Sequence, residues 1–508
     1  MRLRGIVFAL VSALSFASIS IAADWPMYGH DIAQSRSNSA ETTITTANVA
    51  SLKQLWVFKT AAPVSATPTV VNGVVYFGGW DHNFYAVNAT TGALIWQVSL
   101  VTPQGDNESS PGIQSSATVL GSRVYFGDSC GYLHAYPTDG SGARSTTMTV
   151  RNRGCGSTGT ESPGFPVDLA GALPNAADAP HAALFSSPIP FAPIAGANKG
   201  RMLLYMGEAS HVDNPCIHGA EFALDAKSGK IVWRFDVTPS TAIGGGVWST
   251  PAIDATNNLV YIDTGDCVNN ASAGFSESII ALDASCSGVS VDGSCKGLAP
   301  ENFPPMSPAT PGNPVWYFEA HPNGELADLD FGSSPNVITN NGVPVLVGAG
   351  SKDGAYYAVG AGRLGGRLAW STKVAEVSSV TVGNSISSAL GGFNGSTGFA
   401  NRKVYGNTVD GPEFEVALNG LTGTLAWNAG DAVSSLGAIG LGNGLVYSGD
   451  NSGLFKARDA SSGLLLFEAS VGGAVAGSPV PAESKVFVPA GATSGVPGQQ
   501  FGVYAFGL

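Results

Sequence analysis

One short phrase recurs along the chain and constrains its fold more than any other feature. It consists of an apolar run, a polar turn that contains glycine, and a second apolar run that ends in a large aromatic residue. Copies stand at 86–96 (AVNATTGALIW), 223–233 (ALDAKSGKIVW), 417–427 (ALNGLTGTLAW) and 457–467 (ARDASSGLLLF), and a looser copy ends at Trp370. Alternating apolar residues around a glycine-containing turn are typical of an antiparallel hairpin. The chain therefore repeats one β-hairpin.

A second phrase precedes each hairpin. It is a stretch of small residues with Ser, Thr or Pro, followed by an alternating strand, and it begins at 65, 114, 185, 248, 331, 386, 436 and 476. A repeat of about 40 to 50 residues with four short strands is the period of propeller blades, because one four-stranded sheet must stack against neighbours to bury its faces. The sequence therefore predicts an all-β fold, an eight-bladed β-propeller.

The two ends of the repeat array predict how the propeller closes. The eighth unit finishes at 501–508 (FGVYAFGL) without a final aromatic-ended strand, while a strand of that kind, LKQLWVF around Trp56, stands before the first unit. We expect the N-terminal strand to complete the last blade, which removes the open edges of a linear array.

The N-terminal residues indicate a secreted protein. Residues 1–23 carry two arginines, an apolar centre and small residues before Asp24, which is typical of a cleavable signal peptide. We expect residues 24–508 to form one propeller domain in the periplasm or outside the cell, with no membrane anchor. The formal net charge of −13 disfavours binding to nucleic acid.

Six cysteines in an oxidising compartment predict three disulfides. Cys286 and Cys295 would close a local loop. Cys216 and Cys267 follow the equivalent second strand of neighbouring blades, so we expect them to pair. Cys130 and Cys155 pair by elimination.

Several motifs together resemble a known family. The stretches DWPMYGHD, GGGVWSTPAID, TGD, DLDFGSSP and GSKDG, together with the repeated phrase, are similar to the pyrroloquinoline quinone (PQQ) dependent alcohol dehydrogenases, especially polyvinyl-alcohol dehydrogenase and its relatives. The resemblance covers nearly all of the chain after residue 23. It implies a propeller of tryptophan-docking repeats that binds PQQ and Ca²⁺.

The resemblance assigns the cofactor site. Gly246 belongs to the glycine run that leads to Trp248, whose indole would lie under the quinone ring. An aromatic platform suits a flat quinone, and glycine lets the backbone approach closely. Lys352 stands where the family has an Arg or Lys that reaches the quinone oxygens. A blade-packing tryptophan and an ordinary turn lysine are the simpler alternatives.

The resemblance also assigns metal ligands and a catalytic base. Asp266 stands where the family has an Asn that binds Ca²⁺, and a carboxylate oxygen suits that ion. A second ligand would come from blade three, as Asp213 or Glu208. The base would be Asp328 or Asp330, taking the alcohol proton as hydride moves to the quinone. Turn capping is the alternative role for the metal-site carboxylates.

The resemblance thus implies a quinoprotein that oxidises secondary alcohols, including polyvinyl alcohol. The chain has no C-x-x-C-H haem motif and no adjacent cysteines. We therefore expect the electrons to leave to an external acceptor such as a cytochrome c. The alternative is a propeller that has kept the fold without cofactor and serves as a protein-binding scaffold of the outer-membrane-assembly type.

Overall fold

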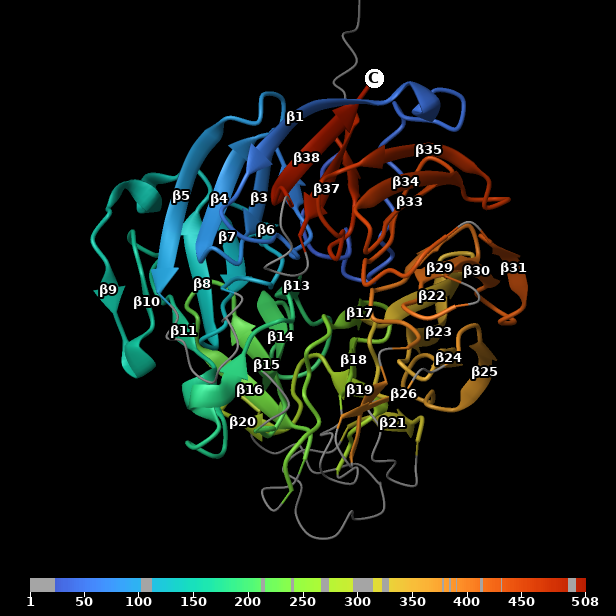
Figure 1. Cartoon of the computed structure of the whole chain (residues 1–508). Helices are drawn as coiled ribbons and strands as arrows, with labels where there is room; N and C mark the ends of the chain where they lie inside the picture. The colour runs from blue at the N-terminus through green and yellow to red at the C-terminus, as the bar shows by residue number, and fades with distance from the viewer. Residues whose placement is uncertain are drawn as a thin grey trace, which may run out of the picture.

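The computed structural model is an all-β protein whose sheets form eight blades around a central channel (Figure 1). It describes residues 23–101, 112–211, 215–238, 242–265, 274–295, 314–321, 329–376, 379–382, 385–389, 391–411, 414–430, 432–491 and 499–508. No helix of this described part is long and apolar enough to cross a membrane. The predicted eight-bladed β-propeller is confirmed.

Each blade is an antiparallel sheet of four strands that run in order from the channel outwards. The innermost strands are β2 (Thr69–Val71), β6 (Thr118–Leu120), β13 (Ile189–Phe191), β17 (Ala252–Asp254), β22 (Asn336–Asn340), β28 (Gly398–Ala400), β32 (Gly440–Gly442) and β36 (Val480–Ala482). The second strands are β3 (Val74–Gly78), β7 (Arg123–Gly127), β14 (Leu203–Ser210), β18 (Leu259–Asp263), β23 (Val343–Gly350), β29 (Lys403–Asn407), β33 (Leu445–Gly449) and β37 (Lys485–Ala490).

In blades one, three, five, six and seven the two outer strands form the hairpin of the repeated phrase. The third strands are β4 (Asn83–Asn88), β8 (Tyr132–Pro137), β15 (Ala220–Asp225), β19 (Ser278–Asp283), β24 (Ala355–Gly360), β30 (Glu415–Asn419), β34 (Leu454–Asp459) and β38 (Gly502–Gly507). The outermost strands are β5 (Leu94–Val101), β11 (Val167–Asp168), β16 (Ile231–Asp236), β21 (Trp316–Glu319), β25 (Leu368–Lys373), β31 (Leu425–Asn428), β35 (Leu465–Ser470) and β1 (Lys53–Lys59).

Insertions between these strands add short elements. The extra strands are β9 (Thr149–Val150), β10 (Gly156–Ser157), β12 (Ala182–Ala183), β20 (Val289–Ser290), β26 (Ser379–Val382) and β27 (Ser385–Ala389), and the 3₁₀ helices are η1 (Val49–Ser51), η2 (Ser141–Arg144), η3 (Asn152–Gly154), η4 (Ala170–Ala172) and η5 (Ala179–His181). The expected start of the sixth unit at 386 falls on the β26–β27 hairpin, because blade six begins only at β28.

Tryptophans near the start of the outermost strands join neighbouring blades, which explains the repeated phrase. Trp427 of blade six donates its indole N–H to the carbonyl of Ala460 in blade seven, at 3.1 Å. Its ring covers Gly463, where a Cβ would lie 2.7 Å from Trp427 Cε3. The turn glycines Gly92, Gly366, Gly423 and Gly463 therefore also make room for the tryptophan of the preceding blade, whereas Gly229 packs against Gly164 and Val167.

The N-terminal strand closes the ring as expected. β1 pairs antiparallel with β38, with Trp56 opposite Ala505. The indole of Trp56 then packs over Gly92 of blade one and donates to the carbonyl of Ala89 at 3.3 Å. Blade eight thus combines β1 with the three last strands of the chain, and the docking contact continues across the closure.

Residues 23–39, the N-terminal segment, wind around one end of the channel. Backbone hydrogen bonds tie this segment to the inner parts of seven blades: Ala23 to Glu483, Trp25 to Val70, Pro26 to Val119, Ile32 to Ile253, Ala33 to Val337, Ser35 to Phe399, and Arg36 to Leu441. The alternation of apolar residues within each blade does not predict this arrangement, because the residues that bond to the N-terminal segment lie up to several hundred positions further along the chain.

Candidate functional site

A cavity of about 460 Å³ lies in the central channel. Every blade contributes to its wall, and Tyr28 of the N-terminal segment joins them. Its lining includes Trp80, Phe185, His211, Gly246, Trp248, Gly265, Asp330, Gly332, Lys352 and Asn394. The space is the size of a small-molecule site.

Trp248, Lys352 and Asp330 meet on one side of this cavity. The ammonium of Lys352 lies 5.3 Å from the centre of the Trp248 ring and 2.7 Å from Oδ1 of Asp330. Trp248 precedes β17 of blade four, whereas Asp330 and Lys352 flank β22 and β23 of blade five. The blade-four and blade-five motifs, over 80 residues apart in sequence, therefore share one wall.

Glycines keep this wall open beside the aromatic ring. A Cβ on Gly265 would lie 2.7 Å from Oδ2 of Asp330 and 3.5 Å from Cδ1 of Trp248. The amide of Gly265 donates to the carbonyl of Gly246 at 2.8 Å, which joins the turn after β18 to the glycine run before Trp248. A side chain at Gly265 would push the Asp330 carboxylate out of its present place.

Asp263 supports the segment that carries Trp248, and the sequence analysis did not single it out. Its carboxylate accepts a short hydrogen bond from the hydroxyl of Ser249, and burial raises the pKa of Asp263 well above its usual range. The signal that could have identified Asp263 is its place in the motif YIDTGD, two residues before Gly265. His211, Phe185 and Trp80 also line the cavity without having been assigned to it.

Glu208 is the only described one of the three carboxylates considered as metal ligands, and it does not line the cavity. It is fully buried near the turn of blade two, where a Cβ on Gly131 would lie 3.0 Å from Oε1. Neither carboxylate oxygen has a hydrogen-bond partner among the described residues. Burial therefore raises the pKa of Glu208 well above its usual range, against a smaller opposing effect of Arg153.

Three of the predicted site residues cannot be placed. Asp213, Asp266 and Asp328 lie outside the described residues, whereas Asp330 lines the cavity. Within the described ranges, no group of three His, Cys, Asp or Glu side chains could hold a metal ion.

Comparisons with known proteins identify the family of this chain. A family model described as the glucose/ethanol/alcohol dehydrogenase β-propeller domain, of the PQQ type, matches residues 25–289. The chain belongs to this family. A second model, described as the outer membrane protein assembly factor BamB, matches residues 412–500.

Relatives of this PQQ-type propeller family include enzymes that act on alcohols. The polyvinylalcohol dehydrogenase of Sphingopyxis sp. (strain 113P3) is 25% identical over 294 residues, which cover 50% of this chain and 42% of that protein. The dehydrogenase subunit of the quinone alcohol dehydrogenase of Gluconobacter oxydans (strain 621H) is 24% identical over 277 residues, 48% of this chain and 32% of that protein. The chain thus matches less than half the length of these relatives.

Solved structures share the propeller fold of the family. The quinohemoprotein alcohol dehydrogenase from Comamonas testosteroni superposes with a TM-score of 0.68 at 18% identity, covering 95% of this chain and 80% of that one. A europium-containing methanol dehydrogenase superposes with a TM-score of 0.67 at 14% identity, covering 96% and 98%. At such identities the similarity is one of fold.

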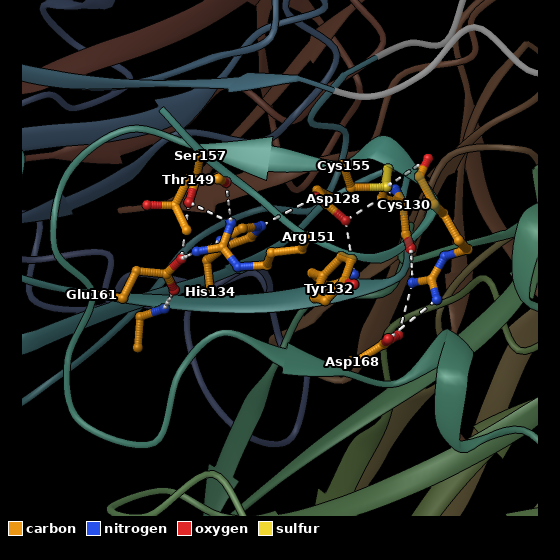
Figure 2. Close-up of polar contacts among 12 residues, drawn as sticks. Asp128, Cys130, Tyr132, His134, Thr149, Arg151, Cys155, Ser157, Glu161 and Asp168 are labelled. Carbon is orange, nitrogen blue, oxygen red and sulfur yellow. Dashed lines mark hydrogen bonds and ion pairs between the residues drawn. A yellow bond between two sulfur atoms is a disulfide. The ribbon is translucent and has the colours of Figure 1, made fainter. Parts of the chain in front are cut away.

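In this PQQ-type propeller, a disulfide and ion pairs fix the insertion within blade two, between β8 and β11. Cys130 and Cys155 are joined, as are Cys286 and Cys295, which confirms two of the expected pairs. Cys216 is also in a disulfide, but its expected partner Cys267 lies outside the described residues. Figure 2 shows the first bridge beside a buried polar cluster.

His134 is the centre of that cluster. Its ring nitrogens lie 3.1 Å from Asp128 and 3.1 Å from Glu161, and all three side chains are buried (Figure 2). Arg151 of the insertion adds a contact of 3.2 Å to Glu161. Burial lowers the pKa of His134, but the two carboxylates together outweigh it and raise the pKa to about 9. The cluster thus attaches the insertion to blade two.

Proposed function

We propose that this chain is a secreted or periplasmic, PQQ- and Ca²⁺-dependent dehydrogenase that oxidises secondary alcohols, including those of polyvinyl alcohol. Electrons pass to an external acceptor such as a cytochrome c. The observation that carries the proposal is the convergence of Trp248, Lys352 and Asp330 on one cavity wall.

The described residues fit a flat anionic quinone. The Trp248 ring offers a stacking face on the cavity wall, and the nearby glycines leave the space beside it free of side chains. The ammonium of Lys352 lies over that ring, 5.3 Å from its centre, and a cation in this place suits contact with quinone oxygens. PQQ supplies the two-electron chemistry when it is bound.

The metal would lie beside the quinone on the side of blades three and four. Asp266 directly follows Gly265, whose backbone lines the cavity, so its carboxylate is the first proposed ligand. For the blade-three ligand, the position of Glu208 outside the cavity wall favours Asp213. Ca²⁺ prefers such oxygen ligands.

Asp330 is the proposed base, in preference to Asp328. Its carboxylate lines the cavity, where one oxygen contacts Lys352 and the other lies next to Gly265. An alcohol bound over the edge of Trp248 would present its hydroxyl to this carboxylate, which would take the proton as the carbon loses hydride. Lys352 would hold the Asp330 carboxylate in place.

The test is reconstitution. Purified protein with PQQ and Ca²⁺ should show quinone absorbance and reduce a dye with a secondary alcohol, whereas protein with Ca²⁺ alone should not. If neither absorbance nor dye reduction appears with any secondary alcohol, the enzymatic proposal is wrong. Such a result would support the scaffold alternative, for which the match at residues 412–500 is the present argument.

A further inference from the structure

A ring of hydroxyl groups runs around the channel from blade to blade. In each step a backbone N–H of one blade donates to a Ser or Thr hydroxyl oxygen of a neighbouring blade, at 2.9 to 3.0 Å. We call this set the hydroxyl ring: Thr67, Ser116, Ser187, Thr250, Ser334, Ser396 and Ser478. Ala438 takes the corresponding place in blade seven.

Four members of the hydroxyl ring present hydrogen-bond donors to the cavity. Ser116, Ser187, Thr250 and Ser334 line it and are at most 3% exposed. Because each oxygen already accepts a backbone N–H, its own hydrogen is left to donate. Among the described residues these four hydroxyls have no acceptor, whereas Ser478 donates to the carbonyl of Ile439.

A buried cation lies behind Tyr28, at the end of the cavity that the N-terminal segment covers. We call this the inner end of the cavity. Arg36 is fully buried, and none of its three guanidinium nitrogens has a hydrogen-bond partner among the described residues. Its Cζ lies 4.0 Å from the centre of the Tyr28 ring, and Tyr28 both lines the cavity and shares a hydrogen bond of 2.8 Å with Ser396. An unpaired buried charge is costly, and its field is weakly screened in the interior.

These features favour one class of ligand. Hydroxyl donors with unused hydrogens, in front of an uncompensated cation, suit an oxyanion and disfavour a ligand cation. Lys352 belongs to the wall described above, over the Trp248 ring and beside Asp330. Thr250 follows Trp248 by two residues and precedes β17, whose Ile253 bonds to Ile32, so along the chain Thr250 stands between the indole and the contact with the N-terminal segment.

We propose that the inner end of the cavity is an oxyanion subsite. The hydroxyls of Ser116, Ser187, Thr250 and Ser334 donate to a carboxylate on the channel axis, and Arg36 supplies the compensating positive charge through Tyr28. The carboxylate belongs either to a quinone stacked on Trp248 or to a free small anion. The subsite itself does not depend on the proposed enzymatic function.

Acetate is the probe, and thermal unfolding measures its binding. Ligand binding to the folded state raises the melting temperature with concentration, so sodium acetate should raise it more than sodium chloride at equal ionic strength. Thr250→Val should weaken acetate binding about tenfold, the loss expected for one charge-assisted hydrogen bond. Thr67→Val is the matched control, because it removes the same inter-blade acceptor at a residue that does not line the cavity.

Arg36→Met gives a second, independent measurement. It should also weaken acetate binding about tenfold, while the variant is at least as stable as the wild type in chloride, because an unpaired buried charge is gone. The proposal is overturned if acetate has no specific effect on the wild type, or if Thr250→Val and Thr67→Val respond to acetate equally.

PQQ titrations identify the source of the carboxylate. If the quinone supplies it, acetate should raise the apparent Kd of PQQ measured by tryptophan quenching, and Thr250→Val should weaken PQQ binding while Thr67→Val does not. If the anion is free, acetate should leave the Kd of PQQ unchanged. Binding of acetate without any binding of PQQ would refute the proposed function and support the subsite.

Discussion

The indole of Trp427 covers Gly463 in the next blade, so closely that a Cβ on this glycine would lie 2.7 Å from the ring. The same contact joins Trp370 to Gly423 and Trp316 to Gly366, with a φ of +73° to +82° at these two glycines. The glycine of the repeated phrase thus has two separate functions, a turn conformation and a docking surface.

Gly463→Ala should separate these two functions. Both Gly463 and Gly444 lie in blade seven with a φ of +78°, but nothing lies within 4 Å of a Cβ on Gly444. Gly444→Ala should lower the free energy of unfolding by about 1 to 2 kcal/mol for backbone strain, and Gly463→Ala by about 1 to 3 kcal/mol more for overpacking against Trp427. Urea unfolding of both variants checks this, and equal losses would contradict the docking role.

Asp330→Asn should abolish proton abstraction with the cavity shape unchanged. We expect kcat to fall about 10²- to 10⁴-fold, the usual contribution of a general base, while PQQ still binds. Steady-state kinetics together with PQQ absorbance measures both. Lys373→Met is the control, since this lysine belongs to an exposed ion pair on the outside of blade five. Unchanged kcat in Asp330→Asn would remove Asp330 as the base.

Lys352→Met should weaken cofactor binding. The substitution removes a cation beside the Trp248 ring and leaves the Asp330 carboxylate without its ion pair. Loss of one hydrogen bond to a charged group corresponds to about a 10- to 100-fold rise in the Kd of PQQ. Equilibrium dialysis measures that Kd, and a value equal to that of the wild type would place Lys352 outside the quinone contacts.

Asp266→Ala and Asp266→Asn should differ if this residue binds Ca²⁺. The alanine variant should fold normally and lose metal-dependent activity, because the cation is underligated. The asparagine variant should retain much more activity, since an amide oxygen is also a ligand. Melting temperature, dye reduction and reactivation by Ca²⁺ after chelation decide this. Modest and equal stability losses in both variants, without a selective loss of activity, would indicate turn capping instead.

His134 should make stability depend on pH. Its pKa is raised to about 9 in the folded protein, above the ordinary value of about 6.5 in an unfolded chain. The stabilisation is therefore complete below about pH 6.5 and is lost as pH rises through about 9, by up to about 3 kcal/mol. Urea unfolding between pH 6 and 10 measures this.

His134→Gln is the control for that experiment. Other groups titrate in the same range, such as His321, whose pKa Asp353 and Glu277 raise to about 10 against the effect of burial. The difference between wild type and variant isolates His134. An identical pH slope in both proteins would show that the cluster with Asp128 and Glu161 does not hold the imidazole charged.

The sequence by itself determined the repeated architecture. Hairpins depend on contacts between residues a few positions apart, so alternation and turn glycines were sufficient to predict eight blades, and the strand around Trp56 predicted the closure with β38. The same local reading identified the disulfide between Cys286 and Cys295, which are nine residues apart, and Cys130 with Cys155 followed by elimination. Trp248 stood out because it precedes a strand, whereas the tryptophans of the repeated phrase stand at its end.

Only the tertiary structure decided what faces the channel. The route of the N-terminal segment, the burial of Arg36, and the hydroxyl ring all depend on contacts between different blades, which no sequence period encodes. Glu208 faces Gly131 of blade two and lies outside the cavity wall, whereas its neighbour Ala209 faces Gly246 before blade four and lines the cavity, because successive residues of a strand point to opposite faces of the sheet. In a closed ring of sheets, the way the ring closes decides which residues face each other across the channel. The distance between those residues along the sequence does not.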